Sequence, residues 1–154
     1  MENEDAAFSS VWSRVTQSRS DGRHGGDADR LPALISEEQS AEAFYRFARG
    51  AVHGETAALF GQLLKSCRAR LSLLRTLLFL RGGAPVRPCG QPELPASTLA
   101  LLRQAYILES AAAERYGAAA MAADDPRLSA STFGFSQQTA ENADRIVALL
   151  EKIL

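Results

Sequence analysis

Two stretches of this 154-residue chain place a glutamate in the middle of a face that otherwise suits a protein core. In residues 102–120, spacings of four and three mark one face of an α-helix: Leu102, Tyr106, Glu109, Ala113, Tyr116 and Ala120. An earlier stretch repeats the pattern with Leu34, Glu38, Ala41, Tyr45, Ala48 and Val52. Ionised carboxylates are rarely buried unless something pairs with them. Glu38 and Glu109 are therefore the first candidates for chemistry.

A tyrosine follows each of these glutamates at the same distance. Tyr45 lies seven residues after Glu38, and Tyr116 lies seven residues after Glu109. Both tyrosines fall on the same helical face as their glutamate and are expected to flank the site. As core aromatics they would use their hydroxyl groups to bond a carboxylate.

A third stretch supplies a cation at a core position. Its inward stripe is Phe60, Leu63, Cys67, Arg70, Leu74 and Leu77. Arg70 lies seven residues from both Leu63 and Leu77, so it points where they point. We expect Arg70 to pair with Glu38, Glu109 or both through a charge-assisted, bidentate contact. The alternative is that Arg70 extends to the surface and leaves the glutamates half-buried.

Four long helices are needed to position these residues. Leu and Ala dominate the composition and β-branched residues are few, which favours an all-α protein. The first helix begins near Pro32 or at Ser36, and the later start would place Glu38 in the first turn, where the helix dipole stabilises a carboxylate. That helix ends at Gly50. The others are predicted over Gly54–Arg81, Ser97–Ala123 and Leu128–Leu154, the last irregular near Gly134.

A proline-rich segment separates the second helix from the third. Residues 82–95, GGAPVRPCGQPELP, hold four of the six prolines, which no helix tolerates. Fourteen extended residues span about 45 Å. The segment can therefore run the length of a four-helix bundle, although a compact coil is also possible.

The first thirty residues form a separate N-terminal region, followed by the bundle over 31–154. Residues 5–16 place Phe8, Val11, Trp12 and Val15 on one face of a short amphipathic helix. That face either packs on its own domain or anchors a protein partner or a second subunit, since Trp is enriched at interfaces. Residues 17–30 are polar and Gly-rich, as in a flexible linker.

Two helical hairpins, a long crossover and polar groups on the inward stripes describe a ferritin-type bundle. The chain resembles the rubrerythrin/ferritin-like superfamily, in particular small bacterial ferritin-like proteins. Four segments carry the resemblance: EQSAEAFYRFA (38–48), LFGQLLKSCRARLSLL (59–74), LESAAAERYGAAA (108–120) and ENADRIVALL (141–150). In that family the first and third helices each give one Glu, and the second and fourth each give a Glu-x-x-His pair. These six residues hold two metal ions.

The resemblance implies a di-metal site that has largely decayed. Glu38 and Glu109 match the single-Glu positions. Cys67 and Arg70 stand where the second helix should carry Glu and His, and Thr139 and Asn142 stand at the pair of the fourth helix. A phasing two residues later would use Glu141 and Asp144, but that face continues into Ala148 and Glu151 instead of the apolar stripe. We therefore expect no bound cofactor.

Three functions follow as hypotheses. The first is a non-enzymatic structural or interaction protein that self-associates or binds a protein partner. The second is a di-iron or di-manganese oxidase or peroxidase of rubrerythrin type that uses Glu38, Glu109, Glu141 and Asp144. The third is a small-ligand pocket in the emptied centre. Catalysis by Cys67 is disfavoured, because burial beside glutamates raises a thiol pKa.

Charge and hydropathy exclude other classes. The net charge of −1 gives no electrostatic case for nucleic acid or an anionic membrane surface. No apolar run approaches the roughly 18 residues that a membrane span needs. The start of the chain, MENEDAAF, is acidic where a signal peptide would be basic. We expect a cytoplasmic protein.

Overall fold

The computed structural model describes residues 27–154, and in that range all regular structure is helical. The predicted N-terminal helix with Phe8, Val11, Trp12 and Val15 lies outside the described residues. The helices are α2 (Asp27–Ala51), α3 (Gly54–Leu80), α4 (Thr98–Ala122) and α5 (Pro126–Ile153). The all-α prediction is confirmed.

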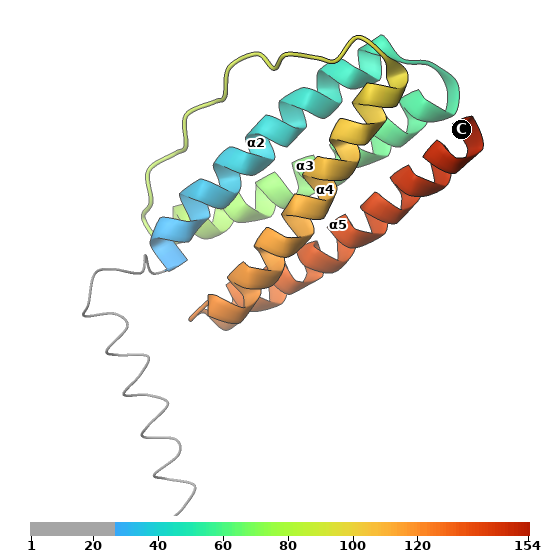
Figure 1. The fold of residues 1–154 in the computed structure, drawn as a ribbon. Helices are drawn as coiled ribbons and strands as arrows, with labels where there is room; N and C mark the ends of the chain where they lie inside the picture. The colour runs from blue at the N-terminus through green and yellow to red at the C-terminus, as the bar shows by residue number, and fades with distance from the viewer. Residues whose placement is uncertain (1–26) are drawn as a thin grey trace, which may run out of the picture.

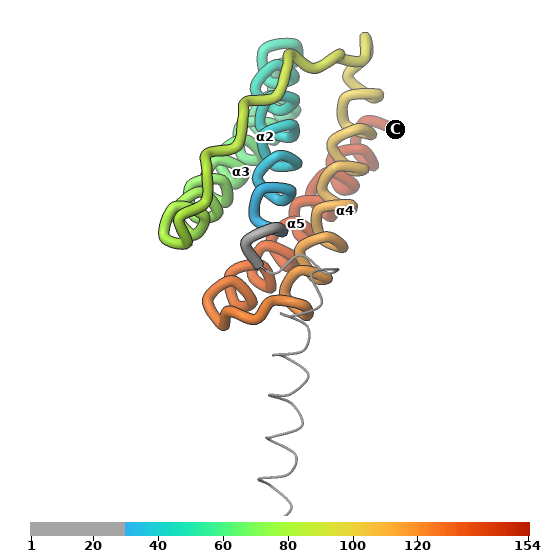
Figure 2. Tube along the Cα trace, turned by 90° about the vertical axis from the view of Figure 1, so that its left-hand side faces the viewer, coloured from blue at the N-terminus to red at the C-terminus, as the bar shows by residue number. Residues whose placement is uncertain are grey.

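The four helices form two antiparallel hairpins that lie side by side. One hairpin is α2 with α3, and the other is α4 with α5 (Figures 1 and 2). The segment between α3 and α4 runs back along α2 from one end of the bundle to the other, so α3 and α4 point the same way and α2 and α4 are antiparallel (Figure 1). Of the two alternatives for the proline-rich segment, the long crossover is correct and the compact coil is wrong.

The crossover is held against α2 along its course. The Cys89 thiol donates a hydrogen bond to the Gln39 carbonyl at 3.3 Å, and Val86 packs against the core. At the start of the crossover Gly82 has φ +72°, a left-handed conformation that favours glycine, and the Gly83 amide bonds the Leu78 carbonyl. These contacts end α3 and turn the chain toward α2.

The ends of the helices differ from the predictions mainly at the N-termini. Helix α2 begins at Asp27, so both predicted starts, Pro32 and Ser36, are wrong and Pro32 lies inside the helix. Glu38 therefore lies about three turns into α2, too far for the dipole of the helix N-terminus to act on it. Helix α5 begins at Pro126 and continues through Gly134 without a break, which contradicts the predicted irregularity.

On α4, every second inward-facing residue differs from the predicted one. Leu102, Glu109 and Tyr116 are buried as predicted, but Tyr106 is 41% exposed and the intervening buried residues are Ala105, Ala112 and Ala119. The seven-residue spacing fixes Leu102, Glu109 and Tyr116 on the inward face. Between two of these residues, either of two adjacent residues can face inward. The small side chains of Ala105, Ala112 and Ala119 let the neighbouring helices approach α4 closely. The larger Tyr106 ring does not fit there and lies on the outer side of α4.

The stripe of α3 is as predicted. Phe60, Leu63, Cys67, Arg70, Leu74 and Leu77 are all buried. On α5, Thr139, Asn142, Ala143 and Ile146 are buried. None of the described helices combines the length and the apolar character that a bilayer span requires.

Candidate functional site: a buried arginine–glutamate cluster

All four described helices contribute polar side chains to one cluster in the centre of the bundle. Glu38 comes from α2, Arg70 from α3 and Glu109 from α4, and these three are only 1–2% exposed. Arg70 is the largest of the fully buried side chains. Tyr45, Tyr116, Cys67, Thr139 and Asn142 are buried around them. The eight residues singled out from the sequence therefore all lie in the bundle interior.

Arg70 forms an internal ion pair and does not extend to the surface. Its Nε donates to Glu38 Oε1 at 2.9 Å and its Nη2 donates to Glu38 Oε2 at 3.3 Å, which makes the contact bidentate. Its Nη2 also lies 3.7 Å from Glu109 Oε1. The guanidinium thus neutralises Glu38 directly and attracts Glu109 across the bundle.

The two tyrosines bond the glutamates in a crossed arrangement. The Tyr116 hydroxyl of α4 donates to Glu38 Oε1 at 2.6 Å, and the Tyr45 hydroxyl of α2 donates to Glu109 Oε1 at 2.7 Å. Each tyrosine therefore binds the glutamate of the other helix, not that of its own. Because α2 and α4 are antiparallel, the same seven-residue spacing on both helices produces this locally two-fold arrangement.

Shorter side chains complete the shell of each carboxylate. The Cys67 thiol donates to Glu38 Oε2 at 2.8 Å, and Asn142 Nδ2 donates to Glu109 Oε2 at 3.3 Å. Thr139 is buried beside them, but its hydroxyl donates to the Phe135 carbonyl of its own helix at 2.7 Å. Thr139 therefore fills the centre without contributing a donor to either carboxylate.

Burial and charge shift the pKa values of the cluster in a consistent way. Burial raises the pKa of Glu109, while Arg70 and the Tyr45 hydrogen bond oppose that rise. Burial alone would lower the pKa of Arg70, but Glu38 and Glu109 raise it on balance. Burial and the neighbouring carboxylates raise the pKa of Cys67 and of both tyrosines. The guanidinium therefore stays charged, and the thiol and the phenols stay protonated as donors.

These residues do not fit a di-metal centre. A guanidinium, which has no acceptor atom and a fixed positive charge, lies between the two carboxylates that would bridge the metals. Glu141 and Asp144, the alternative ligands, are exposed on α5. Among residues 27–154, no group of three or more His, Cys, Asp or Glu side chains is placed to hold a metal ion.

Two polar residues that contact the cluster, Gln138 and Arg145, were not predicted. Gln138 Oε1 accepts from Arg70 Nη1 at 2.9 Å, and Asn142 Oδ1 accepts from Arg145 Nη1 at 3.4 Å. Gln138 lies next to Thr139 in the sequence and falls outside the apolar stripe of α5, so periodicity gave no signal for it. Its long side chain reaches the cluster from the flank of the helix.

The fold is similar to that of a solved structure of another protein. A similar solved structure is that of a conserved hypothetical protein, Rv2844, from Mycobacterium tuberculosis, with a TM-score of 0.72 and 21% sequence identity. The similarity covers 82% of this chain and 99% of that one. No family model and no curated protein matches this chain. At this identity the likeness shows a shared fold and carries no activity.

Proposed function

We propose that this chain is a ferritin-like bundle in which an arginine–glutamate cluster has replaced the di-metal centre, and that it acts as a structural or interaction protein. The observation that carries the proposal is the position of Arg70, bidentate to Glu38 and 3.7 Å from Glu109. A fixed cation there supplies the positive charge that metal ions supply to paired carboxylates. The long crossover and the parallel course of α3 and α4 support the ferritin-like assignment (Figure 1).

The cluster offers little to a substrate. Glu38, Arg70 and Glu109 are at most 2% exposed, and both tyrosines are fully buried. Both oxygens of each carboxylate already accept hydrogen bonds. The side chains that occupy the centre argue against the third hypothesis, a small-ligand pocket. A role that depends on the outer surface fits these observations better than catalysis in the interior.

Metal content is the experiment that tests the proposal. The chain would be expressed with iron, manganese and zinc supplied, purified without a polyhistidine tag, and submitted to elemental analysis. We expect metal well below one ion per chain and unchanged by Glu109→Ala. Iron or manganese near stoichiometry, lost in Glu109→Ala, would overturn the proposal and revive the oxidase or peroxidase hypothesis.

A variant with the ligands restored provides the matched control. Cys67→Glu with Arg70→His rebuilds the Glu-x-x-His pair of α3, and Thr139→Glu with Asn142→His rebuilds that of α5. With Glu38 and Glu109 retained, this chain has the six-ligand set of di-metal bundles. We expect it to take up iron or manganese under the conditions in which the native chain does not, with the helical circular-dichroism signal retained.

A further inference from the structure

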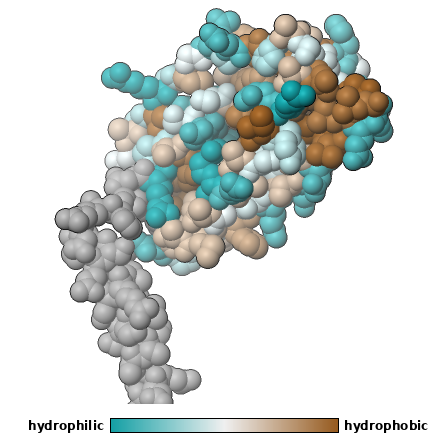
Figure 3. Space-filling view, in the orientation of Figure 1, coloured by the Kyte–Doolittle hydropathy of each residue, from teal (hydrophilic) through white to brown (hydrophobic). Residues whose placement is uncertain are grey.

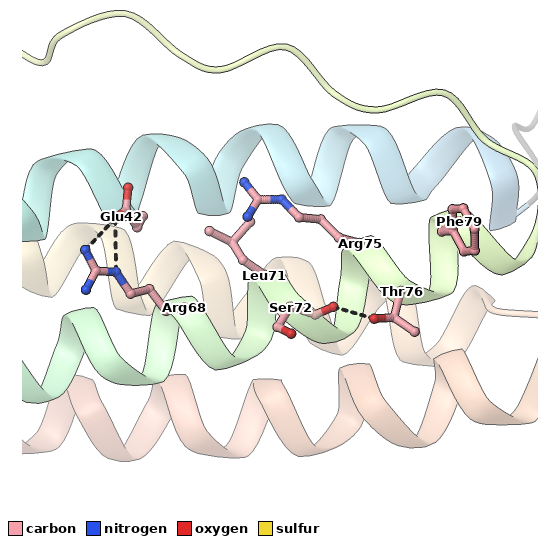
Figure 4. Close-up of a pocket in the computed structure, with 7 residues that line it drawn as sticks. All are labelled: Glu42, Arg68, Leu71, Ser72, Arg75, Thr76 and Phe79. Atoms are coloured by element: carbon pink, nitrogen blue, oxygen red, sulfur yellow. Dashed lines mark hydrogen bonds and ion pairs between the residues drawn. The ribbon is translucent and has the colours of Figure 1, made fainter.

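Two pockets that share lining residues follow α3 on the outer side of the first hairpin. One pocket of about 630 Å³ lies along the middle of the helix and is lined by Arg68, Ser72, Arg75 and Thr76, with Glu42 on α2 (Figure 4). A second pocket of about 560 Å³ lies where α3 ends and the crossover begins. Arg75 and Phe79 line both pockets. We call the combined depression the α3 groove.

The two halves of the α3 groove differ in polarity. In the polar half, Glu42 pairs with Arg68 at 3.2 Å, so Arg75 leaves one guanidinium charge in excess among the lining residues. The other half is lined by Leu78, Phe79, Pro85 and Val86. The groove therefore suits a ligand that is acidic at one end and apolar at the other.

Phe79 is exposed far more than an aromatic ring normally is. It is 79% exposed, although it lies between the two pockets of the groove. Other parts of the surface are also apolar, among them a patch near the C-terminal end of α5 (Figure 3). The α3 groove combines an exposed aromatic ring with a hollow and an excess charge, which is typical of a surface that something covers.

The apolar half of the groove lies at the end of the bundle where the N-terminal region joins it. Helix α2 begins at Asp27, at the same end at which α3 finishes (Figures 1 and 2). Residues 16–26 would span about 36 Å when fully extended and about 18 Å as a flexible chain. The apolar face of Phe8, Val11, Trp12 and Val15 is therefore within reach of the groove.

The order of residues in the N-terminal region matches the order of the two halves of the groove. Counting back from Asp27, the chain presents a polar linker, then the apolar face and then the acidic residues Glu2, Glu4 and Asp5. Moving along α3 from its end toward its middle, the groove presents first the apolar half and then Arg75 and Arg68. The apolar and charged parts of the segment therefore follow one another in the same order as the apolar and charged halves of the groove.

We infer that the α3 groove is the binding site for the N-terminal segment of the same chain. The apolar face packs on Phe79, Leu78 and Val86, and the acidic start of the chain lies against Arg75. The inference is independent of whether the bundle centre binds metal. It turns the amphipathic segment into an internal ligand that covers the groove and competes with any outside partner for it.

Trp12, the only tryptophan in the chain, provides a direct readout in the full-length protein. We expect its emission to be blue-shifted and protected from acrylamide quenching in the native chain. Phe79→Asp and Arg75→Glu should each lower the ratio of docked to undocked segment, the former by about tenfold or more, because a buried phenylalanine contact is lost. Phe133→Asp is the matched control, since Phe133 is 58% exposed on α5 and does not line the groove.

Charge reversal and dilution complete the test. Glu4→Arg combined with Arg75→Glu should restore part of the quenching protection lost in Arg75→Glu alone. Protection that is independent of protein concentration, in a chain that sediments as a monomer, supports docking within one molecule. The inference is wrong if native Trp12 is quenched as strongly as in urea, if Phe79→Asp changes nothing, or if protection appears only in a dimer. The last result would assign the groove to the segment of a second copy.

Discussion

Replacing Arg70 by methionine is the sharpest test of the buried cluster. Methionine has nearly the length of the arginine stem and no charge, so the change removes the cation while it keeps most of the packing. Glu38 loses both of its guanidinium hydrogen bonds and keeps those from Cys67 and Tyr116. Glu109 loses the positive charge 3.7 Å from its Oε1. Two carboxylates then remain buried without a counter-charge.

The expected cost follows from the burial of the partners. Removing one member of a buried ion pair destabilises a protein by about 3–5 kcal/mol. For a bundle of this size each kcal/mol lowers the melting temperature by about 3–4 °C, so Arg70→Met should melt about 10–20 °C lower at pH 7. The loss should shrink toward pH 4, because burial raises the pKa of Glu109, and its protonation in the folded state removes one of the two unpaired charges.

Urea unfolding followed by circular dichroism measures this free energy. Arg68→Met is the control, because Arg68 is 56% exposed in its pair with Glu42 and such pairs contribute at most about 1 kcal/mol. Adding Glu38→Gln and Glu109→Gln to Arg70→Met should recover most of the loss, since no buried charge remains. A loss below about 1 kcal/mol in Arg70→Met alone, or a triple variant no more stable than the single one, would show that the buried carboxylates do not depend on Arg70.

The other predictions concern individual members of the cluster and the two thiols. Burial raises the pKa of Glu109, so the native state binds a proton more readily than the unfolded state. The free energy of unfolding should therefore rise as the pH falls from the folded pKa of Glu109 toward the ordinary pKa of a glutamate. Glu109→Gln should flatten this part of the profile of unfolding free energy against pH. Tyr45→Phe and Tyr116→Phe should each cost about 1.5–3 kcal/mol in urea unfolding, since each removes a hydrogen bond to a buried charged group. With a thiol reagent, exposed Cys89 should react in the native protein, whereas buried Cys67, whose pKa is raised, should react only after unfolding; equal rates for both would contradict the burial of Cys67.

The inward residues of α3 could be predicted from the sequence because the seven-residue spacing is a strong constraint. Arg70 lies seven residues from Leu63 and from Leu77, and a helix places all three on one side. The same reasoning located Glu38 and Glu109 on the buried faces of α2 and α4. Thr139 and Asn142 were predicted because only their phasing continues into the apolar stripe of α5.

Other features depend on tertiary contacts that periodicity does not encode. Whether Tyr106 or Ala105 faces inward depends on how closely the neighbouring helices approach α4, and a seven-residue repeat fits both. The start of α2 at Asp27 goes against the local signals at Pro32 and Ser36. The crossed tyrosine pairing needs the direction of α2 relative to α4, which follows from the course of the crossover and not from either helix alone.

The cluster also explains how the two hairpins are positioned against each other. Contacts within each hairpin are far more extensive than contacts between them, and apolar faces rich in Leu and Ala tolerate a slip along the helix axis. Three hydrogen bonds cross between the hairpins at the centre: Tyr45 to Glu109, Tyr116 to Glu38, and Arg70 to Gln138.

If one hairpin slipped past the other by one helical turn, about 5.4 Å, all three of these hydrogen bonds would break. The buried charges would then lose their partners. A fully apolar centre could be as stable as this one or more so. The charged cluster therefore contributes mainly to a single register between the hairpins. The crossed Glu–Tyr pairs provide that register symmetrically, and Arg70 allows both carboxylates to remain in the core.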